Sequence, residues 1–390
     1  MKISIIGTTN TQAFSNKNDM EIFSGHVAGV CYMKNDFASI INEPTDKTYR
    51  RIEQTKNSGH HSVYDHNYIN LYLQDIPKAF AMLLNNEKAY TTSEKSARYT
   101  KMQPVGEQKE LYEKWQNIFT EVIAKKYKQK YPEFFTDTKI SKLAQENARY
   151  LISVFTPTSM VYSVSYRQLN YLYGFMQQEL SNDNSNKFMQ LLKPTLSDFC
   201  NAIEKLDIID NTLQHNNKNR KFSLIETFNT NKKQYFGDVY QTTYDGTFAQ
   251  LAQAQRHRTI TYSFSLYDNP TFYTPPILKN DDKLNAMWQA DCKLVSEQMP
   301  QGTMIKINEC GTLENFILKM KERNCTHAQL EINMQTSATL QLYLNALQTN
   351  NHPMYQHLKL YSNGARCTFP NYTCKEKCSL PIGINQTREI

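Results

Sequence analysis

The second half of this 390-residue chain repeats the order of elements that its first half predicts. In the first half, the apolar-rich stretch Tyr68–Leu73 predicts a strand, and Pro77 opens a predicted helix that runs to Leu84. In the second half, Tyr235–Tyr240 predicts a strand, and Gly246–Ala254 continues as a helix. A chain of this kind is expected to fold into two related modules, which can place two sets of site residues across one interface.

We predict four segments on this basis: a first module at 1–207, a linker at 208–222, a second module at 223–350 and a tail at 351–390. The predicted linker is rich in Asn, Asp and Lys and lacks a sustained apolar period. The first seven residues are expected to form a buried strand. Apolar spacing predicts further helices over three segments, Glu110–Tyr127, Lys187–Ile208 and Leu313–Arg323.

The charge and the cysteine content limit the classes of partner and compartment. A net charge of +7 favours an anionic partner, but the basic residues are dispersed and form no long tract. No apolar run is long enough to cross a bilayer, and the first residues are too few for a signal-peptide core. The eight scattered cysteines fit reduced thiols better than a disulfide scaffold. We therefore expect a cytoplasmic protein with no membrane partner and no nucleic-acid partner.

Three cation-capable side chains are consecutive at Arg256, His257 and Arg258, where the second predicted helix continues. Consecutive side chains point in different directions around a helix, so at least one of the three should face neighbouring protein or a bound anion. The alternative is a solvated basic helix end, where cations complement the helix dipole. The triplet alone does not decide between these two interpretations.

Two stretches of the first half carry the pattern of a known family. Residues 59–66 read GHHSVYDH, and residues 93–99 read SEKSARY. This order resembles the flavin-dependent thymidylate synthases (ThyX), whose sequences carry Gly-His-Glu-Ser/Thr and Glu-His, then Arg-His-Arg, seven residues, Ser, one residue and Arg-Tyr. In the first half, Ser96 and Arg98 match the end of this motif, whereas residues 86–88, which read NEK, stand at the place of Arg-His-Arg.

The second half shows the reverse pattern. Arg256, His257 and Arg258 match the start of the motif, but Leu266 and Asp268 replace its serine and arginine. Each half of the chain therefore keeps the part of the motif that the other half lacks.

A second landmark of the resemblance is divided in the same way. In the first half, the run Asn147-Ala148-Arg149 and the later Arg167 match family residues, whereas Glu314 takes the place of that later arginine in the second half. The second half in turn carries HAQLEI at residues 327–332, which matches the family. The resemblance covers roughly residues 59–180 and 241–344.

The resemblance implies an α+β fold with two tandem modules, each an antiparallel sheet with helices, that form a pseudo-dimer. It also implies the methylation of dUMP to dTMP, with FAD as cofactor and methylenetetrahydrofolate and NADPH as co-substrates. Because active sites in this family combine residues of different subunits, one composite site between the modules is expected. A homodimer of such chains would correspond to a pseudo-tetramer.

Roles for individual residues also follow from the resemblance. Ser96, Arg98 and Glu94 would be the catalytic residues. Ser96 and Arg98 would also bind the nucleotide together with Arg167, because arginine and hydroxyl groups suit phosphate. A further set of side chains would bind the flavin: Arg256, His257, Arg258, His60 and Ser62.

Other interpretations of these residues and of the chain remain open. Ser96 and Arg98 could be turn residues, Arg167 a surface ion-pair partner, and His61 and His66 polar residues of which one is buried. The whole chain could be a related enzyme that modifies a pyrimidine nucleotide, for example by hydroxymethylation. It could also be a noncatalytic nucleotide-binding or scaffold protein derived from the family, or a basic nucleic-acid-binding protein.

Three cysteines lie close together in the tail, Cys367, Cys374 and Cys378, with His352 and His357 before them. Thiolate and imidazole groups suit zinc, but the paired Cys-x2-Cys spacing of a zinc knuckle is missing. We therefore predict no metal, with the three cysteines as weak candidates. The resemblance does not extend to this tail.

Overall fold

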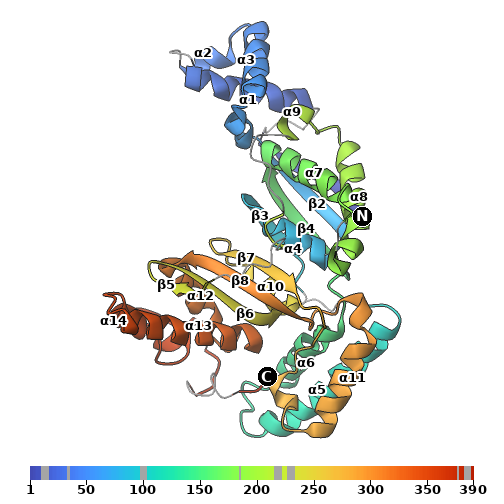
Figure 1. Cartoon of the computed structure of the whole chain (residues 1–390), viewed down its shortest axis with the longest axis vertical. Helices are drawn as coiled ribbons and strands as arrows, with labels where there is room; N and C mark the ends of the chain where they lie inside the picture. Colours follow the sequence, from blue (N-terminus) through green and yellow to red (C-terminus); the bar gives the residue numbers. More distant parts are fainter. Residues whose placement is uncertain are drawn as a thin grey trace. The chain divides into compact units, whose positions relative to one another are not determined.

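The computed structural model describes residues 1–9, 17–32, 36–96, 103–183, 186–214, 222–225, 233–375, 377–381 and 388–390. The chain forms two compact units. The first unit contains Met1–Lys95 and Pro157–Phe222, and the second contains Ser96–Thr156 and Ser223–Ile390. Each unit combines an antiparallel sheet with helices (Figure 1), which confirms the mixed helix and antiparallel-sheet class.

The first unit is built on a four-stranded sheet in the order β1-β2-β4-β3. Its strands are β1 (Lys2–Thr8), β2 (Tyr68–Pro77), β3 (Tyr90–Glu94) and β4 (Pro157–Ser165). Alternate residues of β2, among them Leu71 and Leu73, are fully buried, as expected for a strand with one covered face. The prediction of a buried first strand is wrong: β1 pairs only with β2, and its side chains are exposed or half-buried, because it lies at the sheet edge.

Helices cover this sheet and extend beyond one end of it (Figure 1). The helices α4 (Lys78–Leu84), α7 (Tyr166–Leu180) and α8 (Lys187–Glu204) pack with the sheet, and the rings of Phe80 and Phe199 lie 5.1 Å apart. The remaining elements of the unit are α1 (Lys17–Tyr32), α2 (Phe37–Ile41), α3 (Thr45–Asn57), η1 (His61–His66) and α9 (Asn211–Gln214).

The sheet of the second unit has the order β5-β6-β8-β7. Its strands are β5 (Tyr235–Phe236), β6 (Val239–Thr247), β7 (Thr261–Leu266) and β8 (Met304–Thr312). The helices α10 (Phe248–Ala254), α12 (Leu313–Arg323), α13 (Leu330–Thr349) and α14 (Tyr355–Lys359) accompany it. An aromatic cluster of Tyr240, Phe316 and Tyr343 joins β6, α12 and α13.

The two sheets have the same strand order, and a helix follows directly after β2 and β6 and after β4 and β8, whereas helices follow β1 but β5 leads straight into β6. The strands β4 and β8 both contain nine residues. Each ends at a hydroxyl residue, Ser165 or Thr312, whose side chain caps the helix that follows it. One difference lies in β2, which is one residue longer than β6 and has an irregular register between Leu73 and Ile76. The structure thus repeats the element order that the sequence predicts.

A helical layer in the second unit combines segments from both halves of the chain. It contains α5 (Glu107–Ile123), the π-helical turn η2 (Ala124–Lys128), α6 (Asp137–Ala148), η3 (Arg149–Leu151), η4 (Pro276–Leu278), α11 (Asp282–Leu294) and η5 (Ser296–Gln298). The rings of Trp115 and Trp288 meet edge to face at 4.8 Å, and the Trp115 indole donates to Asp291 at 2.7 Å. Because α5 and α6 pack with α11, the compact units and the predicted modules divide the chain differently.

Several predicted helices and strands match the structure, but the strand predicted at Tyr235–Tyr240 is divided between β5 and β6, and the helix predicted from Gly246 begins at Phe248. The strand at Tyr68–Leu73 lies in β2, the helix at Leu313–Arg323 is α12, and the helix that begins after Pro77 is α4. The first part of the predicted linker is packed: Ile208 and Leu213 are fully buried. Residues 215–221 of that linker lie outside the described residues.

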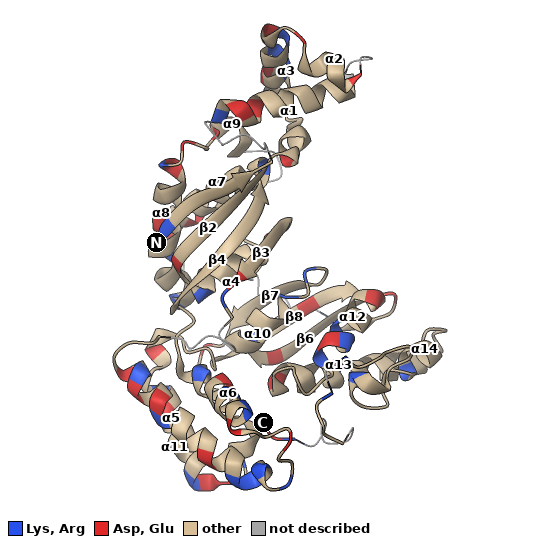
Figure 2. Cartoon of the chain, turned by 180° about the vertical axis from the view of Figure 1, so that it is seen from behind, with Lys and Arg blue, Asp and Glu red and all other residues tan. Residues whose placement is uncertain are grey.

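Lysine, arginine, aspartate and glutamate residues are interspersed along the helices that the structure describes, α5 and α11 among them (Figure 2). A mixture of this kind is typical of a solvated surface. None of the helices in the described ranges is both long and apolar enough to cross a membrane.

Candidate functional site

The Arg256-His257-Arg258 triplet lies in the turn between α10 and β7. The helix α10 begins after Thr247, whose side chain accepts a hydrogen bond from the Gln250 amide at 3.0 Å, and it ends at Ala254. The prediction that the helix continues through the triplet is therefore wrong, because the chain turns there to enter β7. Arg256 and Arg258 are exposed, whereas His257 is buried.

His257 is held from within the fold by α12. Its Nε2 atom accepts a hydrogen bond from the Arg323 guanidinium at 2.8 Å. Burial, together with the nearby cations of Arg323 and Lys319, lowers the pKa of His257 to about 2. His257 is thus a neutral acceptor, and the positive charge of the triplet comes from Arg256 and Arg258.

Arg167 is placed in the first turn of α7, directly after β4. Its guanidinium contacts Asp65 at 2.6 Å and Tyr171 Oη at 3.0 Å, and it lies 5.1 Å from the Tyr171 ring centre. Asp65 also accepts a hydrogen bond from Ser165 at 2.7 Å. Arg167 is thus an ion-pair partner, as one of the two interpretations of the sequence expected. The same contacts fix the direction of its guanidinium.

Of the predicted flavin ligands, His60 directly precedes the turn η1, and Ser62 lies within that turn, as Asp65 does. His60 is half-buried and Ser62 is exposed. Between them, His61 is buried and its Nε2 atom lies 3.0 Å from the Lys56 carbonyl, so it is the buried histidine of this stretch. Because Asp65 pairs with Arg167, the structure places this turn beside the start of α7.

Glu94 ends strand β3 and is a buried, paired carboxylate. It accepts a hydrogen bond from Lys78 at 2.6 Å, and its side chain is only 1% exposed. Glu94 lies opposite Met160 in β4, five residues before the end of the strand, whereas Arg167 follows that end. At roughly 3.3 Å per residue, the two side chains start from positions well over 10 Å apart, so the first unit does not bring them together.

Ser96 belongs to the second unit, and Arg98 lies outside the described residues. The strand register nevertheless identifies the residue of the second sheet that corresponds to Ser96. Glu94 faces Met160 and Phe264 faces Ile307, which are the fourth residues of β4 and β8. Ser96 therefore corresponds to Leu266, which is the correspondence that the motif spacing predicts. The roles of Ser96, Arg98 and Glu94 in catalysis stay a prediction.

Two family-like motifs from opposite halves of the chain meet inside the second unit. Arg149 donates to Gln329 Oε1, and the Tyr150 hydroxyl donates to Glu331 at 2.7 Å. Glu331 also accepts from the backbone amide and the hydroxyl of Thr247, at 3.0 and 2.9 Å. Both motifs are visible in the sequence, but nothing in their spacing indicates that they touch.

The stability that this contact contributes depends on pH, because the side chain of Glu331 can ionise. Burial raises its pKa to about 7, against the hydrogen bonds from Tyr150 and Thr247. A carboxyl whose pKa is higher in the folded state than in the unfolded state binds more protons when folded, so stability falls as the pH rises from about 4.5 to about 7. We expect urea unfolding to show this decrease, on the order of 3 kcal/mol at most.

The matched variant Glu331→Gln should remove most of this decrease, because an amide does not ionise; its oxygen can accept from the Thr247 amide, and its NH2 group can donate to the hydroxyls of Tyr150 and Thr247. The exposed Glu121→Gln on α5 should leave the slope of stability against pH unchanged. Equal slopes for the wild type and Glu331→Gln over this pH range would contradict the assignment.

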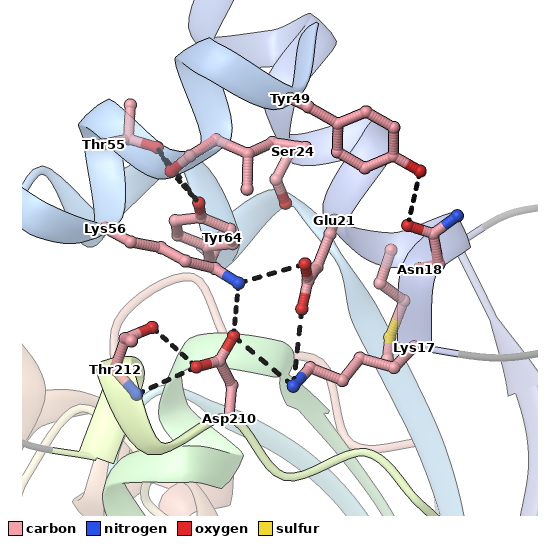
Figure 3. Close-up of polar contacts among 12 residues, drawn as sticks. Lys17, Asn18, Glu21, Ser24, Tyr49, Thr55, Lys56, Tyr64, Asp210 and Thr212 are labelled. Carbon is pink, nitrogen blue, oxygen red and sulfur yellow. Dashed lines mark hydrogen bonds and ion pairs between the residues drawn. The ribbon is translucent and has the colours of Figure 1, made fainter. Parts of the chain in front are cut away.

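A ring of four charged residues in the first unit was not predicted from the sequence. The Lys56 amino group lies between Glu21, at 3.0 Å, and Asp210, at 2.6 Å, and Lys17 approaches the same carboxylates at 3.5 and 3.7 Å (Figure 3). Burial alone would raise the pKa of Asp210, but hydrogen bonds from Lys56 and Thr212 lower it to about 2. The ring joins α1 and α3 to the segment that enters α9.

We expect Lys56→Met to destabilise the first unit by about 1–3 kcal/mol, because Asp210 is buried and loses its nearest cation. The measurement is chemical unfolding. Arg50→Met on the same helix is the matched control, because its partner Asp46 is an exposed residue and such pairs contribute about 0–1 kcal/mol. Equal effects of the two substitutions would show that the ring does not stabilise the fold.

Of the cysteines in the tail, Cys367 is exposed, and Cys374 and Cys378 are half-buried. Within the described ranges, no three His, Cys, Asp or Glu side chains lie close enough together to hold a metal ion. The prediction of no metal, with the three cysteines as weak candidates, stays a prediction.

Residues 16–194 match the family model described as thymidylate synthase complementing protein, Thy1. No curated protein matches the chain. Among solved structures, the chain is similar to thymidylate synthase X from Helicobacter pylori with FAD and dUMP, at 14% identity over 55% of this chain and 96% of that chain, with a TM-score of 0.32. It is also similar to the UMP/dUMP methylase PolB from Streptomyces cacaoi bound with 5-Br dUMP, at 13% identity over 53% and 90%, with a TM-score of 0.32.

Proposed function

Residues 16–194 of this chain match the model of the thymidylate synthase complementing protein family, and on that premise we propose that the protein methylates dUMP to dTMP. The proposed reaction uses FAD as cofactor, methylenetetrahydrofolate as the one-carbon donor and NADPH as reductant. We further propose that the chain is a tandem duplication with one composite site between its modules. The repeated strand order and the repeated helix caps support the duplication.

The observation that carries the proposal is the reciprocal survival of motif halves at matching positions. The first copy keeps Ser96 and Arg98, and the second keeps Arg256 and Arg258. The contacts of Arg149 and Tyr150 with Gln329 and Glu331 also support cooperation between the copies, because each pair joins a motif of the first half to a motif of the second. Independent decay of two sites gives no reason for this complementarity.

The residues of the second unit suit an anionic cofactor. Arg256 and Arg258 expose two guanidinium groups in one turn, and such groups bind phosphate by paired hydrogen bonds. In the first turn of α10, Gln250 is buried and its side-chain amide has no hydrogen-bond partner among the described residues. An unpaired buried amide is costly, and a polar ligand would satisfy it. When bound, reduced flavin would supply the hydride.

Arg167 is the nucleotide-binding candidate with a defined geometry. In the proposed complex, the phosphate of dUMP would compete with Asp65 for the guanidinium, whereas Tyr171 would keep it oriented. Asp65 and Arg167 are both partly exposed, so an anion can reach the pair. The displacement of Asp65 would cost free energy, but a guanidinium that Tyr171 already orients would fix the substrate for reaction.

The visible absorption spectrum of the purified protein, with and without dUMP, tests the proposal. We expect a bound flavin and a dUMP-dependent oxidation of the reduced flavin in the presence of methylenetetrahydrofolate. A colourless protein that binds no FAD would contradict the proposal. A flavoprotein whose product is a hydroxymethylated nucleotide would instead identify the related pyrimidine-modifying enzyme.

A further inference from the structure

Four matched positions between sheet and helices are apolar in the first unit and polar in the second, whereas the place of Glu309 is taken in the first unit by the buried Tyr162. The matched strands and helices allow a comparison position by position. The first unit has apolar side chains at matching places, and all are fully buried: Leu73, Phe80, Leu172 and Met176. The corresponding residues of the second unit carry polar groups: Tyr244, Gln250, Lys319 and Arg323.

A fully buried ion pair lies at the centre of this polar interior. Lys319 on α12 contacts Glu309 on β8 at 2.5 Å, and both side chains are 0% exposed. Tyr240 and Tyr244 donate their hydroxyl hydrogens to the two oxygens of Glu309, at 2.6 and 2.8 Å. The carboxylate therefore has a partner at each oxygen.

Stability does not explain such a pair. Desolvation of two charges offsets most of their attraction, and apolar replacements of buried pairs are often neutral or stabilising. The first unit shows that this fold accepts an apolar side chain, Leu172, at the position of Lys319. The pair instead fixes the position of α12, because its directional hydrogen bonds can form in only one register of the helix against the sheet.

The register of α12 determines the place of the anion-binding turn. Arg323 lies one helical turn after Lys319 and donates to His257 at 2.8 Å. Near the other end of α12, Asn315 donates to the Thr259 carbonyl at 3.2 Å. The helix thus holds the turn on both sides of Arg258.

We propose that Glu309 and Lys319 are positioning residues for the turn that presents Arg256 and Arg258 to a diphosphate group, with α12 transmitting their register through Arg323 and Asn315. That the diphosphate belongs to FAD rests on the proposed function. The positioning itself concerns only the anion and this turn.

The double variant Glu309→Gln/Lys319→Met tests the proposal, since it removes both charges and keeps the volumes. We expect its thermal midpoint to stay within about 5 °C of the wild type, because neither charge is left unpaired. Calorimetric titration should show binding of inorganic diphosphate and of FAD weakened about tenfold, and the imidazole signal of His257 should shift. A folded double variant that binds diphosphate as tightly as the wild type would overturn the proposal.

Asn315→Ala tests the same device without touching the core, because Asn315 is partly exposed. It should weaken diphosphate binding several-fold and leave the thermal midpoint unchanged. Unchanged binding would count against α12 as the transmitting element. This outcome decides the question even where the double variant fails to fold. A wild type that binds diphosphate but not FAD would refute the proposed function and leave the positioning role standing. A wild type that binds neither would overturn both.

Discussion

Lys319→Met alone is expected to lower the free energy of unfolding of the second unit by about 3–5 kcal/mol. The substitution leaves Glu309 fully buried without its cation, and the hydroxyls of Tyr240 and Tyr244 cannot replace that charge. Chemical unfolding followed by tryptophan fluorescence measures the loss, because both tryptophans, Trp115 and Trp288, lie in this unit.

The control is Glu309→Gln/Lys319→Met, which should recover most of the lost stability. In a double-mutant cycle, the coupling between the two sites should therefore be large. If the single and the double variants lose the same stability, Glu309 and Lys319 do not depend on each other, and the geometry of the pair is not what the structure indicates.

Arg258→Ala is expected to weaken the retention of flavin by about 10- to 100-fold, since a hydrogen bond to a charged group contributes about 1.5–3 kcal/mol. The side chain is exposed, so the fold should be unchanged. The flavin content after gel filtration and a fluorescence titration with FAD measure the effect.

Two comparisons make the result specific. Lys283→Ala removes an exposed charge from α11 in the same unit and should leave the flavin affinity unchanged. Arg98→Ala should weaken dUMP binding while the flavin is kept; that role rests on the family resemblance, because Arg98 lies outside the described residues. Loss of flavin in all three variants would contradict the separate roles.

The sequence predicted the elements whose cause is local. The α12 boundaries follow from apolar spacing after a capping Thr312, and the strand at Tyr68–Leu73 follows from its alternation. The prediction failed at the Arg256–Arg258 triplet, because a helix ends where the chain must turn to reach its partner strand, and that partner is distant in sequence. It failed for β1 because an edge position depends on which strands pair.

The candidate site was also predictable from the sequence only in part. The residue types of the motifs were visible, and so was the presence of Glu314 in the second half where the first half has Arg167. The partners of these residues were not visible: Asp65 beside Arg167 and Arg323 beside His257 lie 102 and 66 positions away in the chain. No periodicity or spacing reports a contact between residues so far apart.

The sequence by itself determined the family resemblance and the division of one motif between the two halves of the chain, because these depend on local spacing and residue type. Only the tertiary structure decided that His257 is a buried neutral acceptor, that Glu331 joins motifs of both halves, and that Glu309 and Lys319 pair in the interior. The physical reason is that burial and long-range pairing set the charge state of a side chain, and both arise only when distant segments pack together.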